Sequence, residues 1–432
     1  MKKILDPDKE TWAAILKRPT QSYASLEPLV AKIFTEIADE GDLAVKKYTK
    51  EFDKADLSRL EVDQSAIDHA KDTLSVELKN AIELAKSNIE AFHASQQVLP
   101  KKIETAKGVI CWQEKRAIEK VGLYIPGGTA PLFSTILMLA VPANIAGCEE
   151  VVMCTPCDAE GNIHPAVLYT ADLCGIKKIF KVGGIQAIAA MTFGTESIPQ
   201  VYKIFGPGNQ YVTVAKQMAM KFGVTIDLPA GPSELLVYAD DSANASFMAA
   251  DLLSQAEHGV DSQVVLVCRS MEKLGEIEKE LDEQLKKLPR KDIATKAIEN
   301  SKLIYCSSEK DAIDLINLYA PEHLILSTTD NARIIPMIKN AGSVFVGNYS
   351  PESAGDYASG TNHTLPTNGY ARNFSGVNLE AFQKTVSFQE ISKEGLVQIG
   401  TAIELMAEAE GLFAHKNAVT LRLDSISDNT KN

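Results

Sequence analysis

The stretch VGLYIPGGTAPLFST, residues 121–135, decides the predicted fold. Its first five residues form an uninterrupted apolar run that stops at a proline and two glycines. Such a run is typical of a strand covered on both faces, as the strands of parallel sheets are. Similar runs follow at residues 151–154, 179–182, 204–205, 235–238, 264–268, 303–306, 324–326 and 344–346. Short strands that alternate with helices predict an α/β protein.

Helical periodicity occupies most of the remaining chain. Before residue 100, apolar residues recur at helical spacing in two stripes, at 26–37 and 67–92. Further helices are predicted at 166–174, 211–221, 271–285, 379–388 and 395–412, and a polar tail follows at 425–432. A break near Gly231 and Pro232 divides the strands into two consecutive sheet domains.

Composition narrows the function classes. The 432 residues are 45% hydrophobic and 23% charged, the balance of a globular protein. A net charge of −13 argues against binding to nucleic acid or to an anionic membrane, because both require a basic face. The apolar run at 130–148 is too interrupted to span a bilayer, and the N-terminus shows no secretion signal. Seven scattered cysteines fit a reducing cytoplasm.

The stretch SQAEHG, residues 254–259, closes an apolar helix with hydrogen-bonding side chains. Gln255 and His258 are three residues apart and therefore share one face of the helix. Two interpretations are open. His258 and Gly259 form an ordinary C-terminal cap, or Gln255 and His258 bind a ligand together.

A long loop, SPESAGDYASGTNHTLPTNGY at residues 350–370, contributes a third polar group. Loops of this length are uncommon inside a compact domain, and we interpret this one as an ordered active-site loop. Its Asp356, together with Gln255, His258 and either His363 or His415, offers nitrogen and oxygen ligands. Such a set suits zinc or manganese with open coordination positions, although the wide spacing is no signature by itself.

Glu322 and His323 directly precede the apolar strand at 324–326. A carboxylate and an imidazole at the mouth of a strand can act as an acid–base pair, because the pKa of each can be moved towards neutral pH. The alternative is structural: Glu322 ends the preceding helix and His323 fills the edge of the strand.

Cys154 and Cys157 form a C-x-x-C motif that His164 and Cys174 could complete as a zinc cluster. No second cysteine pair accompanies it, and small buried cysteines at element ends often simply pack. We therefore favour the structural interpretation.

Glycine turns follow three of the strands, at 126–128, 183–184 and 206–208. Their backbone N–H groups could face a phosphate, but none reads G-x-G-x-x-G, and glycines at such turns are often structural. A fourth turn, at 228–234, could offer Ser233 to a ligand at the junction of the two sheet domains.

Taken in order, these segments resemble the histidinol dehydrogenase family. The matching stretches are VGLYIPGGTAPLFST, KIFGPGN, DLPAGPSE, DLLSQAEHG, APEHLI, SPESAGDYASGTNHTLPT and AHKNAVTLR, which cover most of residues 115–422. The resemblance implies two consecutive incomplete Rossmann-like parallel-sheet domains. It implies a helical N-terminal segment at 1–123, packing mostly on the catalytic domain, and an NAD-binding domain at 124–232. A catalytic and metal domain would follow at 233–377, and a small helical dimerisation extension at 378–432.

The resemblance also implies the chemistry: L-histidinol is oxidised to L-histidine through an aldehyde held on the enzyme, with two NAD molecules and one zinc ion per subunit. Glu322 would activate water and His323 would act as the base. The zinc ligands would be Gln255, His258, Asp356 and His415, the last coming from the partner subunit of a cytoplasmic homodimer. Besides these four and His323, the substrate contacts would be Ser233, His363 and Glu410, and the NAD contacts Tyr124, Gln186 and Asn209.

Two other function classes would use the same residues. A zinc-dependent hydrolase shares the ligand set and the Glu322–His323 pair, but it needs no dinucleotide cleft, and the three glycine turns argue against it. A metal-sensing protein would bind zinc without turnover. Alcohol oxidation needs both a base beside the hydroxyl and a bound nicotinamide, which the dehydrogenase interpretation supplies.

Overall fold

The computed structural model describes residues 1–19, 25–127, 131–229 and 231–429. These residues form two compact units, one of Met1–Gln96 and Ile118–Phe382, the other of Gln97–Ala117 and Gln383–Asn432. Two of the predicted turns each contain a residue outside the described ranges, Gly128 and Ala230. Within the described ranges, no helix is both long and apolar enough to cross a membrane.

The first sheet of the larger unit has five parallel strands in the order β6-β5-β4-β7-β8. The strand that comes first in the chain lies in the middle, which is the Rossmann order without its sixth strand. The strands are β4 (Lys120–Tyr124), β5 (Glu150–Thr155), β6 (Lys178–Lys181), β7 (Lys203–Phe205) and β8 (Thr225–Ile226). The helices between and after them are α6 (Phe133–Ala146), α7 (Pro165–Leu173), α8 (Gly184–Phe193) and α9 (Gln210–Met220).

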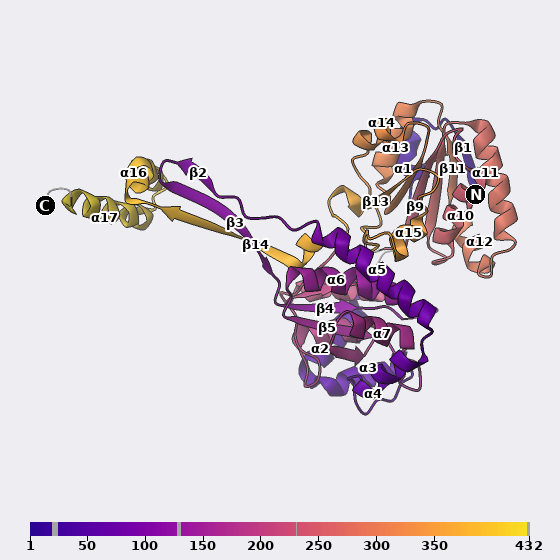
Figure 1. Ribbon diagram of the computed structural model, residues 1–432, viewed down its shortest axis with the longest axis horizontal. Helices are drawn as coiled ribbons and strands as arrows, with labels where there is room; N and C mark the ends of the chain where they lie inside the picture. The colour runs from indigo at the N-terminus through magenta and orange to yellow at the C-terminus, as the bar shows by residue number, and fades with distance from the viewer. Residues whose placement is uncertain (20–24, 128–130, 230, 430–432) are drawn as a thin grey trace. The chain divides into compact units, whose positions relative to one another are not determined.

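The second sheet repeats this strand order, although the sequence shows no repeat. Its parallel strands follow the order β1-β11-β10-β9-β12-β13. They are β9 (Glu234–Ala239), β10 (Gln263–Cys268), β11 (Lys302–Tyr305), β12 (His323–Ser327) and β13 (Ser343–Val346), with β1 (Lys2–Leu5) added at the edge. Figure 1 shows α13 (Glu309–Tyr319) and α1 (Trp12–Ile15) on one face, and α10 (Ala245–Ala256), α11 (Met271–Leu285) and α12 (Lys291–Glu299) on the other. The predicted α/β class, with two incomplete Rossmann-like sheets, is therefore confirmed.

The N-terminal helices pack differently from the expectation. They are α2 (Glu27–Glu40), α3 (Asp42–Phe52), α4 (Gln64–Thr73) and α5 (Val76–Ala94). We expected this segment mostly on the catalytic domain, but Phe34 shares a core with Val152 of β5, and Ile89 shares one with Leu123 of β4. Of the described residues in this segment, those near its start, such as Trp12 and Leu16, join the core of the second sheet. An amphipathic stripe shows which face of a helix is buried but not which sheet will cover it.

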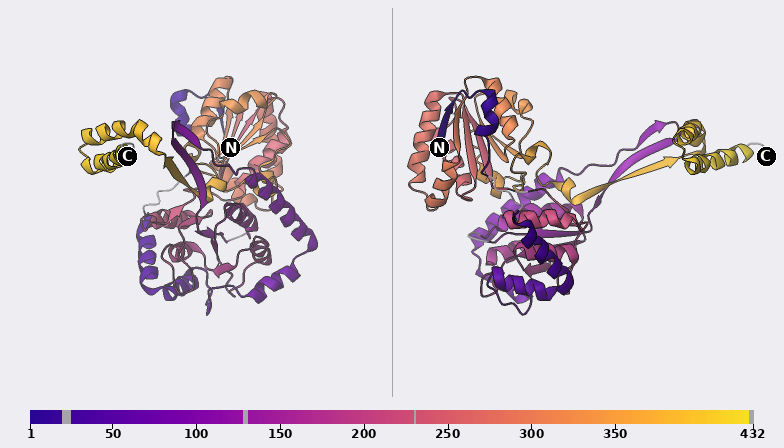
Figure 2. Two further views of the ribbon diagram at one scale, coloured as in Figure 1. Left: turned by 60° about the vertical axis from the view of Figure 1, so that its left-hand side comes forward. Right: turned by 180° about the vertical axis from the view of Figure 1, so that it is seen from behind.

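The smaller unit contains strands that the sequence interpretation missed. An antiparallel sheet joins β2 (Ile103–Ala106), β3 (Val109–Ala117) and β14 (Gln383–Ile391), followed by a hairpin of α16 (Lys393–Ala409) and α17 (Phe413–Asn429), seen in Figure 2. The helix predicted at 379–388 is wrong beyond a short 3-10 turn, since β14 begins at Gln383. Phe388 of β14 stacks on Trp112 of β3, with ring centroids 5.3 Å apart. The predicted polar tail is mostly the last turns of α17.

A buried ion pair fastens the turn after β7. Lys216 Nζ lies 2.5 Å from Asp227 Oδ1, and the two side chains are only 3% and 1% exposed. Lys216 also donates to the carbonyl oxygen of Gly206 (2.8 Å), and Asp227 accepts from the N–H of Gly206 (2.8 Å). The pair therefore holds both peptide groups of the glycine that begins the turn.

We expect Lys216→Met to lower the free energy of unfolding by about 3–5 kcal/mol, because it leaves Asp227 buried without its cation. Urea denaturation followed by circular dichroism measures the change. Lys50→Met is the matched control, since Lys50 and Asp56 form an exposed pair (63% and 77% exposed), and such pairs contribute little. Equal losses in the two variants would contradict the expectation.

Candidate active site

The predicted catalytic residues lie at the N-terminal edge of the second sheet. His323 is the first residue of β12, and Glu234 is the first residue of the neighbouring β9. Sites in α/β proteins are usually built at the carboxyl ends of the strands. Here, α10 runs back from the carboxyl edge and ends at Ala256, so that Gln255 lies in its last turn and His258 follows two residues beyond its end.

At the carboxyl edge of this sheet, polar side chains that follow the strands form hydrogen bonds with neighbouring loops. Asp240, after β9, accepts from the N–H groups of Ser242 and Thr329. Asn348, after β13, accepts from Ser327 Oγ over 2.6 Å and from the N–H of Asn244. These groups therefore already have hydrogen-bond partners.

His323 is buried, and one of its ring nitrogens is free. Its Nδ1 lies 3.3 Å from the carbonyl oxygen of Glu234, 3.7 Å from Glu322 Oε2 and 3.8 Å from Glu352 Oε1. Its Nε2 lies 3.7 Å from Asp356 Oδ1 and has no hydrogen-bond partner among the described residues. Burial lowers the pKa of His323 to about 4, so the imidazole is neutral at pH 7.

Several buried carboxyl groups surround this imidazole. Burial raises the pKa of Glu322 and of Glu352 well above the ordinary value, and neighbouring carboxylates, Asp356 among them, raise both further. Burial also raises the pKa of Asp251 to about 7. Like charges in a low-dielectric site repel one another, and a bound cation would relieve that repulsion.

The structure brings together only part of the predicted zinc set. In the described part of the chain, one group of potential metal ligands has its ligand atoms within 4.8 Å of one another: His323, Glu352 and Asp356. Gln255 is fully buried beside them. The orientation that satisfies its amide directs the nitrogen at Glu352 and lets the oxygen accept from the N–H of Glu234 over 3.0 Å.

His258 follows α10, and its side chain is exposed. Local desolvation lowers the pKa of this imidazole, whereas the negative charges of Asp356 and Glu257 raise it. His415 lies on α17 and Glu410 ends α16, both exposed in the smaller unit. Ser233 is half-buried directly before β9, next to Glu234.

Glu352 is a site residue that the sequence interpretation missed. It is 1% exposed and lies four residues before Asp356 in α15 (Glu352–Tyr357), so both carboxylates point from one face of this short helix. The spacing in PESAGDY carried that signal, but we took the whole stretch as a loop.

The rest of the 350–370 segment is tied down, as an ordered active-site loop would be. His363 Nδ1 lies 2.9 Å from the carbonyl oxygen of Asp356, and its Nε2 lies 3.2 Å from Thr135 Oγ1 on α6. Asn362 donates to the carbonyl oxygen of Met138 over 2.6 Å. The loop therefore spans from the second sheet to a helix of the first.

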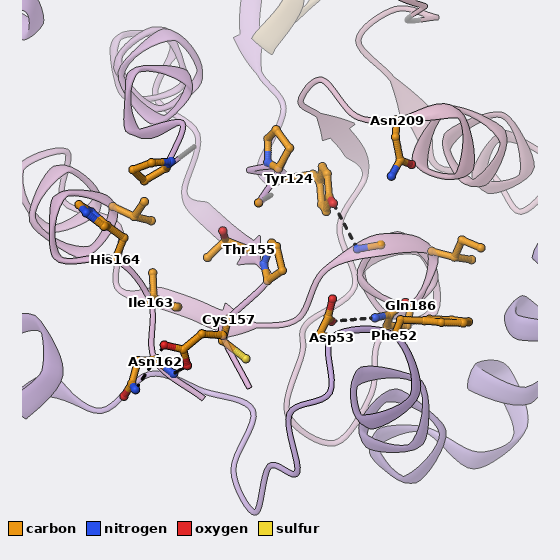
Figure 3. A pocket seen from close by; sticks show the side chains of 18 of the residues that line it. Phe52, Asp53, Tyr124, Thr155, Cys157, Asn162, Ile163, His164, Gln186 and Asn209 are labelled. Carbon is orange, nitrogen blue, oxygen red and sulfur yellow. Dashed lines mark hydrogen bonds between the residues drawn. The ribbon is translucent and has the colours of Figure 1, made fainter. Parts of the chain in front are cut away.

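A pocket of about 990 Å³ opens at the carboxyl edge of the first sheet (Figure 3). Its lining includes the three residues predicted to contact NAD, Tyr124, Gln186 and Asn209. Asp53, from the end of α3, also lines it and accepts from Gln186 Nε2 over 3.3 Å. The pocket lies beyond β4 and β7, where the strand order reverses, which is the usual ligand position in such sheets.

The glycine turns of this pocket are largely structural. The N–H of Gly184 donates to the hydroxyl of Tyr124 (3.2 Å), and Asn209 Oδ1 accepts from the first N–H groups of α9. Gly206 has φ +129°, and a Cβ there would lie 2.0 Å from the carbonyl oxygen of Tyr124. Only glycine permits that close approach.

The structure also supports the packing interpretation of the C-x-x-C motif. Cys154 and Cys174 are buried, and burial raises the pKa of the half-buried Cys157 to about 11. His164 caps α7 instead, its Nδ1 accepting from the N–H of Ala166.

Sequence and structure both match characterised proteins over nearly the whole chain. The family model for histidinol dehydrogenase matches residues 16–423. Histidinol dehydrogenase from Bacteroides thetaiotaomicron is 59% identical over 426 residues, which cover 99% of this chain and 100% of that protein. Histidinol dehydrogenase from Vibrio parahaemolyticus is 50% identical over 424 residues, covering 98% and 97%. The crystal structure of histidinol dehydrogenase from Elizabethkingia anophelis superposes with a TM-score of 0.98 at 55% identity, covering 99% of both chains.

Proposed function

The chain belongs to the histidinol dehydrogenase family, an oxidoreductase family of histidine biosynthesis, and we propose that it oxidises L-histidinol to L-histidine in two successive NAD-dependent steps around His323. One observation carries the proposal. The Nε2 atom of His323 is buried, has no hydrogen-bond partner among the described residues and lies 3.7 Å from Asp356. A neutral imidazole with one free nitrogen is the base that alcohol oxidation requires.

We assign the proton transfers to two neighbouring side chains. When a hydride leaves the carbinol carbon, the hydroxyl proton must leave as well, and His323 Nε2 takes it. The aldehyde must then add water before it can be oxidised again. Glu322, whose pKa is raised by burial, takes the proton from that water. Once His323 has released the first proton to solvent, it takes a hydroxyl proton from the hydrated aldehyde as the second hydride leaves.

The donor set fits a zinc ion. Gln255, His258 and Asp356 would hold it together with His415 of the partner subunit. Bound zinc would act as a Lewis acid that holds the imidazole and the amine of histidinol, so that binding also orients the substrate for reaction. The fit rests on the mixture of amide, imidazole and carboxylate donors and on the crowded buried carboxylates, which favour a cation. Because Glu352 takes the amide nitrogen of Gln255, only the amide oxygen remains as a ligand atom.

NAD would occupy the pocket of Figure 3, in contact with Tyr124, Gln186 and Asn209. The nicotinamide supplies the hydride acceptor, and the protein orients it. Ser233, His363 and Glu410 are proposed substrate contacts on the family resemblance. We further propose a cytoplasmic location, which the seven free thiols support.

A homodimer with shared sites predicts complementation between two inactive variants. His415→Ala removes a ligand donated to the partner's site, and His323→Ala removes the base of its own site. When the two chains are mixed and allowed to exchange subunits, one site in each heterodimer is intact. We expect part of the wild-type activity to return in a histidinol assay. Confirmed exchange without recovery would show that each chain builds its own site.

The enzyme assay tests the proposal as a whole. Purified protein with L-histidinol and NAD is expected to form NADH and histidine, two NADH for each histidine, and to stop when zinc is chelated. A zinc hydrolase would form no NADH, and a metal sensor would bind zinc without any turnover. Absence of NADH formation at every pH and with zinc present would overturn the dehydrogenase assignment.

A further inference from the structure

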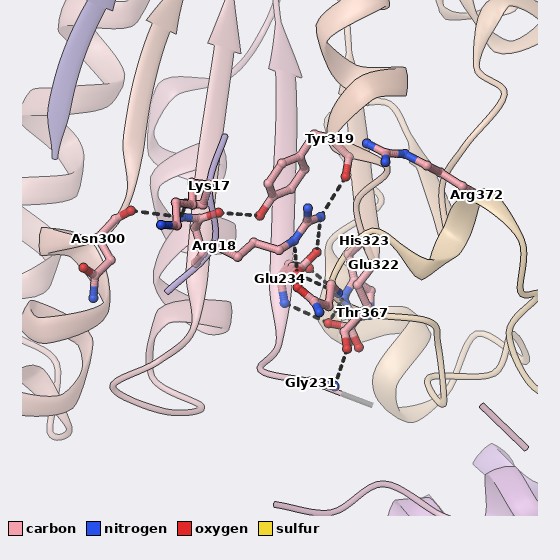
Figure 4. A network of polar contacts seen from close by, with 12 residues as sticks. Lys17, Arg18, Gly231, Glu234, Asn300, Tyr319, Glu322, His323, Thr367 and Arg372 are labelled. Carbon is pink, nitrogen blue, oxygen red and sulfur yellow. Dashed lines mark hydrogen bonds and ion pairs between the residues drawn. The ribbon is translucent and has the colours of Figure 1, made fainter. Parts of the chain in front are cut away.

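An arginine from the N-terminal segment is buried against the start of β9 (Figure 4). Arg18 Nη2 donates to Glu234 Oε2 over 2.8 Å, and Arg18 Nε donates to Glu234 Oε1. The side chains are 12% and 2% exposed. A two-pronged guanidinium–carboxylate pair fixes orientation as well as charge.

Arg18 is itself held in place. Its Nη2 also donates to the carbonyl oxygen of Tyr319 over 2.7 Å, and its guanidinium lies 4.0 Å from the centre of the Tyr319 ring. Gln263 Nε2 donates to the carbonyl oxygen of Lys17 over 3.1 Å, and Gln263 Oε1 accepts from the Tyr319 hydroxyl over 3.0 Å. The network in Figure 4 therefore anchors this segment to β10 and α13.

Glu234 connects this anchor to the proposed catalytic residues. Its N–H donates to Glu322 Oε2 over 2.8 Å, and its carbonyl oxygen lies 3.3 Å from His323 Nδ1. Its carboxylate also accepts from the N–H of Asn368 over 2.7 Å, at the end of the loop that carries Asp356. Glu234 thus contacts both proposed catalytic side chains through its backbone, while Arg18 and the N–H of Asn368 hold its carboxylate.

We propose that Arg18 and Glu234 are positioning residues that hold the Glu322 carboxylate, and to a lesser degree His323, in the geometry for catalysis. The inference rests on the roles proposed for Glu322 and His323. The contact with Glu322 is the shorter of the two, so addition of water to the aldehyde depends on the pair more than the first oxidation does. A displacement of about 1 Å at a reacting group can lower a rate on the order of a hundredfold.

The test is the double variant Arg18→Met/Glu234→Gln in the full-length enzyme. Arg18→Met alone leaves a buried carboxylate without a partner and risks unfolding, whereas removing both charges is often neutral for stability. We expect a folded, zinc-loaded protein whose kcat for histidine formation is lower by about tenfold to a hundredfold. The KM for histidinol should change by less than about twofold, because binding is not the property lost.

The extent to which the second oxidation follows the first distinguishes positioning from a purely structural role, because loss of a structural pair would not change that ratio. We expect the double variant to release histidinaldehyde, detected with a carbonyl-trapping reagent, and to form fewer than two NADH for each histidinol consumed. Arg333→Met/Glu309→Gln is the matched control, because it removes an exposed two-pronged pair (2.8 and 2.7 Å) of the same sheet domain. This control should behave as wild type.

The outcomes separate the inference from the proposed function. If Glu322→Gln in the wild-type background still oxidises the aldehyde, the role proposed for Glu322 fails whatever the double variant does. If Glu322→Gln stops that step, the double variant decides. An unchanged kcat in folded double variant, or an equal loss of both oxidations, would overturn the positioning role.

Discussion

Glu322→Gln is expected to reduce histidine formation from L-histidinol about a thousandfold while the chain stays folded and keeps its zinc. Glutamine has nearly the shape of glutamate but cannot take a proton, so addition of water to the aldehyde loses its base. The amide oxygen can still accept from the N–H of Glu234, which preserves the buried hydrogen bond of 2.8 Å. The rates of NADH and histidine formation at saturating NAD measure the effect.

The matched control for this variant is Glu299→Gln, at the exposed end of α12. It makes the same chemical change away from the cluster and should leave turnover as it is. Full turnover by Glu322→Gln would contradict the assignment and transfer the role of base to a neighbouring carboxylate such as Glu352, whose Oε1 lies 3.8 Å from His323 Nδ1.

His258→Ala should lower turnover on the order of a thousandfold or more, because alignment of the substrate contributes several kcal/mol of barrier lowering. The bound zinc should be lost in parallel, as measured by elemental analysis of the purified protein. Chelation of the wild-type enzyme should have the same effect. The folded structure should persist, since the proposed ligands are few beside the apolar cores of the two sheets.

His69→Ala is the control for the metal-site variant, because His69 is an exposed histidine on α4. It should retain both zinc and activity. Collapse of the circular-dichroism signal on chelation would make the metal structural, and full activity in zinc-free enzyme would remove it from the mechanism.

Most strands of both parallel sheets could be predicted from sequence because they contain a continuous apolar run, but β8, which has only two residues, was missed. β1 escaped prediction because KKIL is short and half charged, and nothing local indicates a partner three hundred residues away. β14 alternates Val386 and Phe388 with polar residues, but a short segment of that kind also fits a helix. The repeated strand order was invisible, because topology depends on which strands pair.

The sequence predicted those site residues that combine a reactive or ligating side chain with a position at the end of a helix or strand. Glu322, His323 and Gln255 stand at element ends, and the structure does gather them. Arg18 and Glu234 are buried because they form an ion pair with each other. They are more than two hundred residues apart, and the local sequence around either residue does not indicate its partner. The usual rule for α/β sites, which places them at the carboxyl ends of strands, does not describe this sheet, because Glu322 and His323 lie at the start of β12.

The pairing of β1 with β11 has a consequence for how the protein is made. Residues Lys2–Leu5 leave the ribosome before their partners Lys302–Tyr305, which follow only after some three hundred further peptide bonds, on the order of tens of seconds later. The first sheet, β4 to β8, is encoded between them as one contiguous block and can fold during that interval. Translation therefore completes the first sheet before the second, and β1 takes its place at the edge of the second sheet only once β11 has been made.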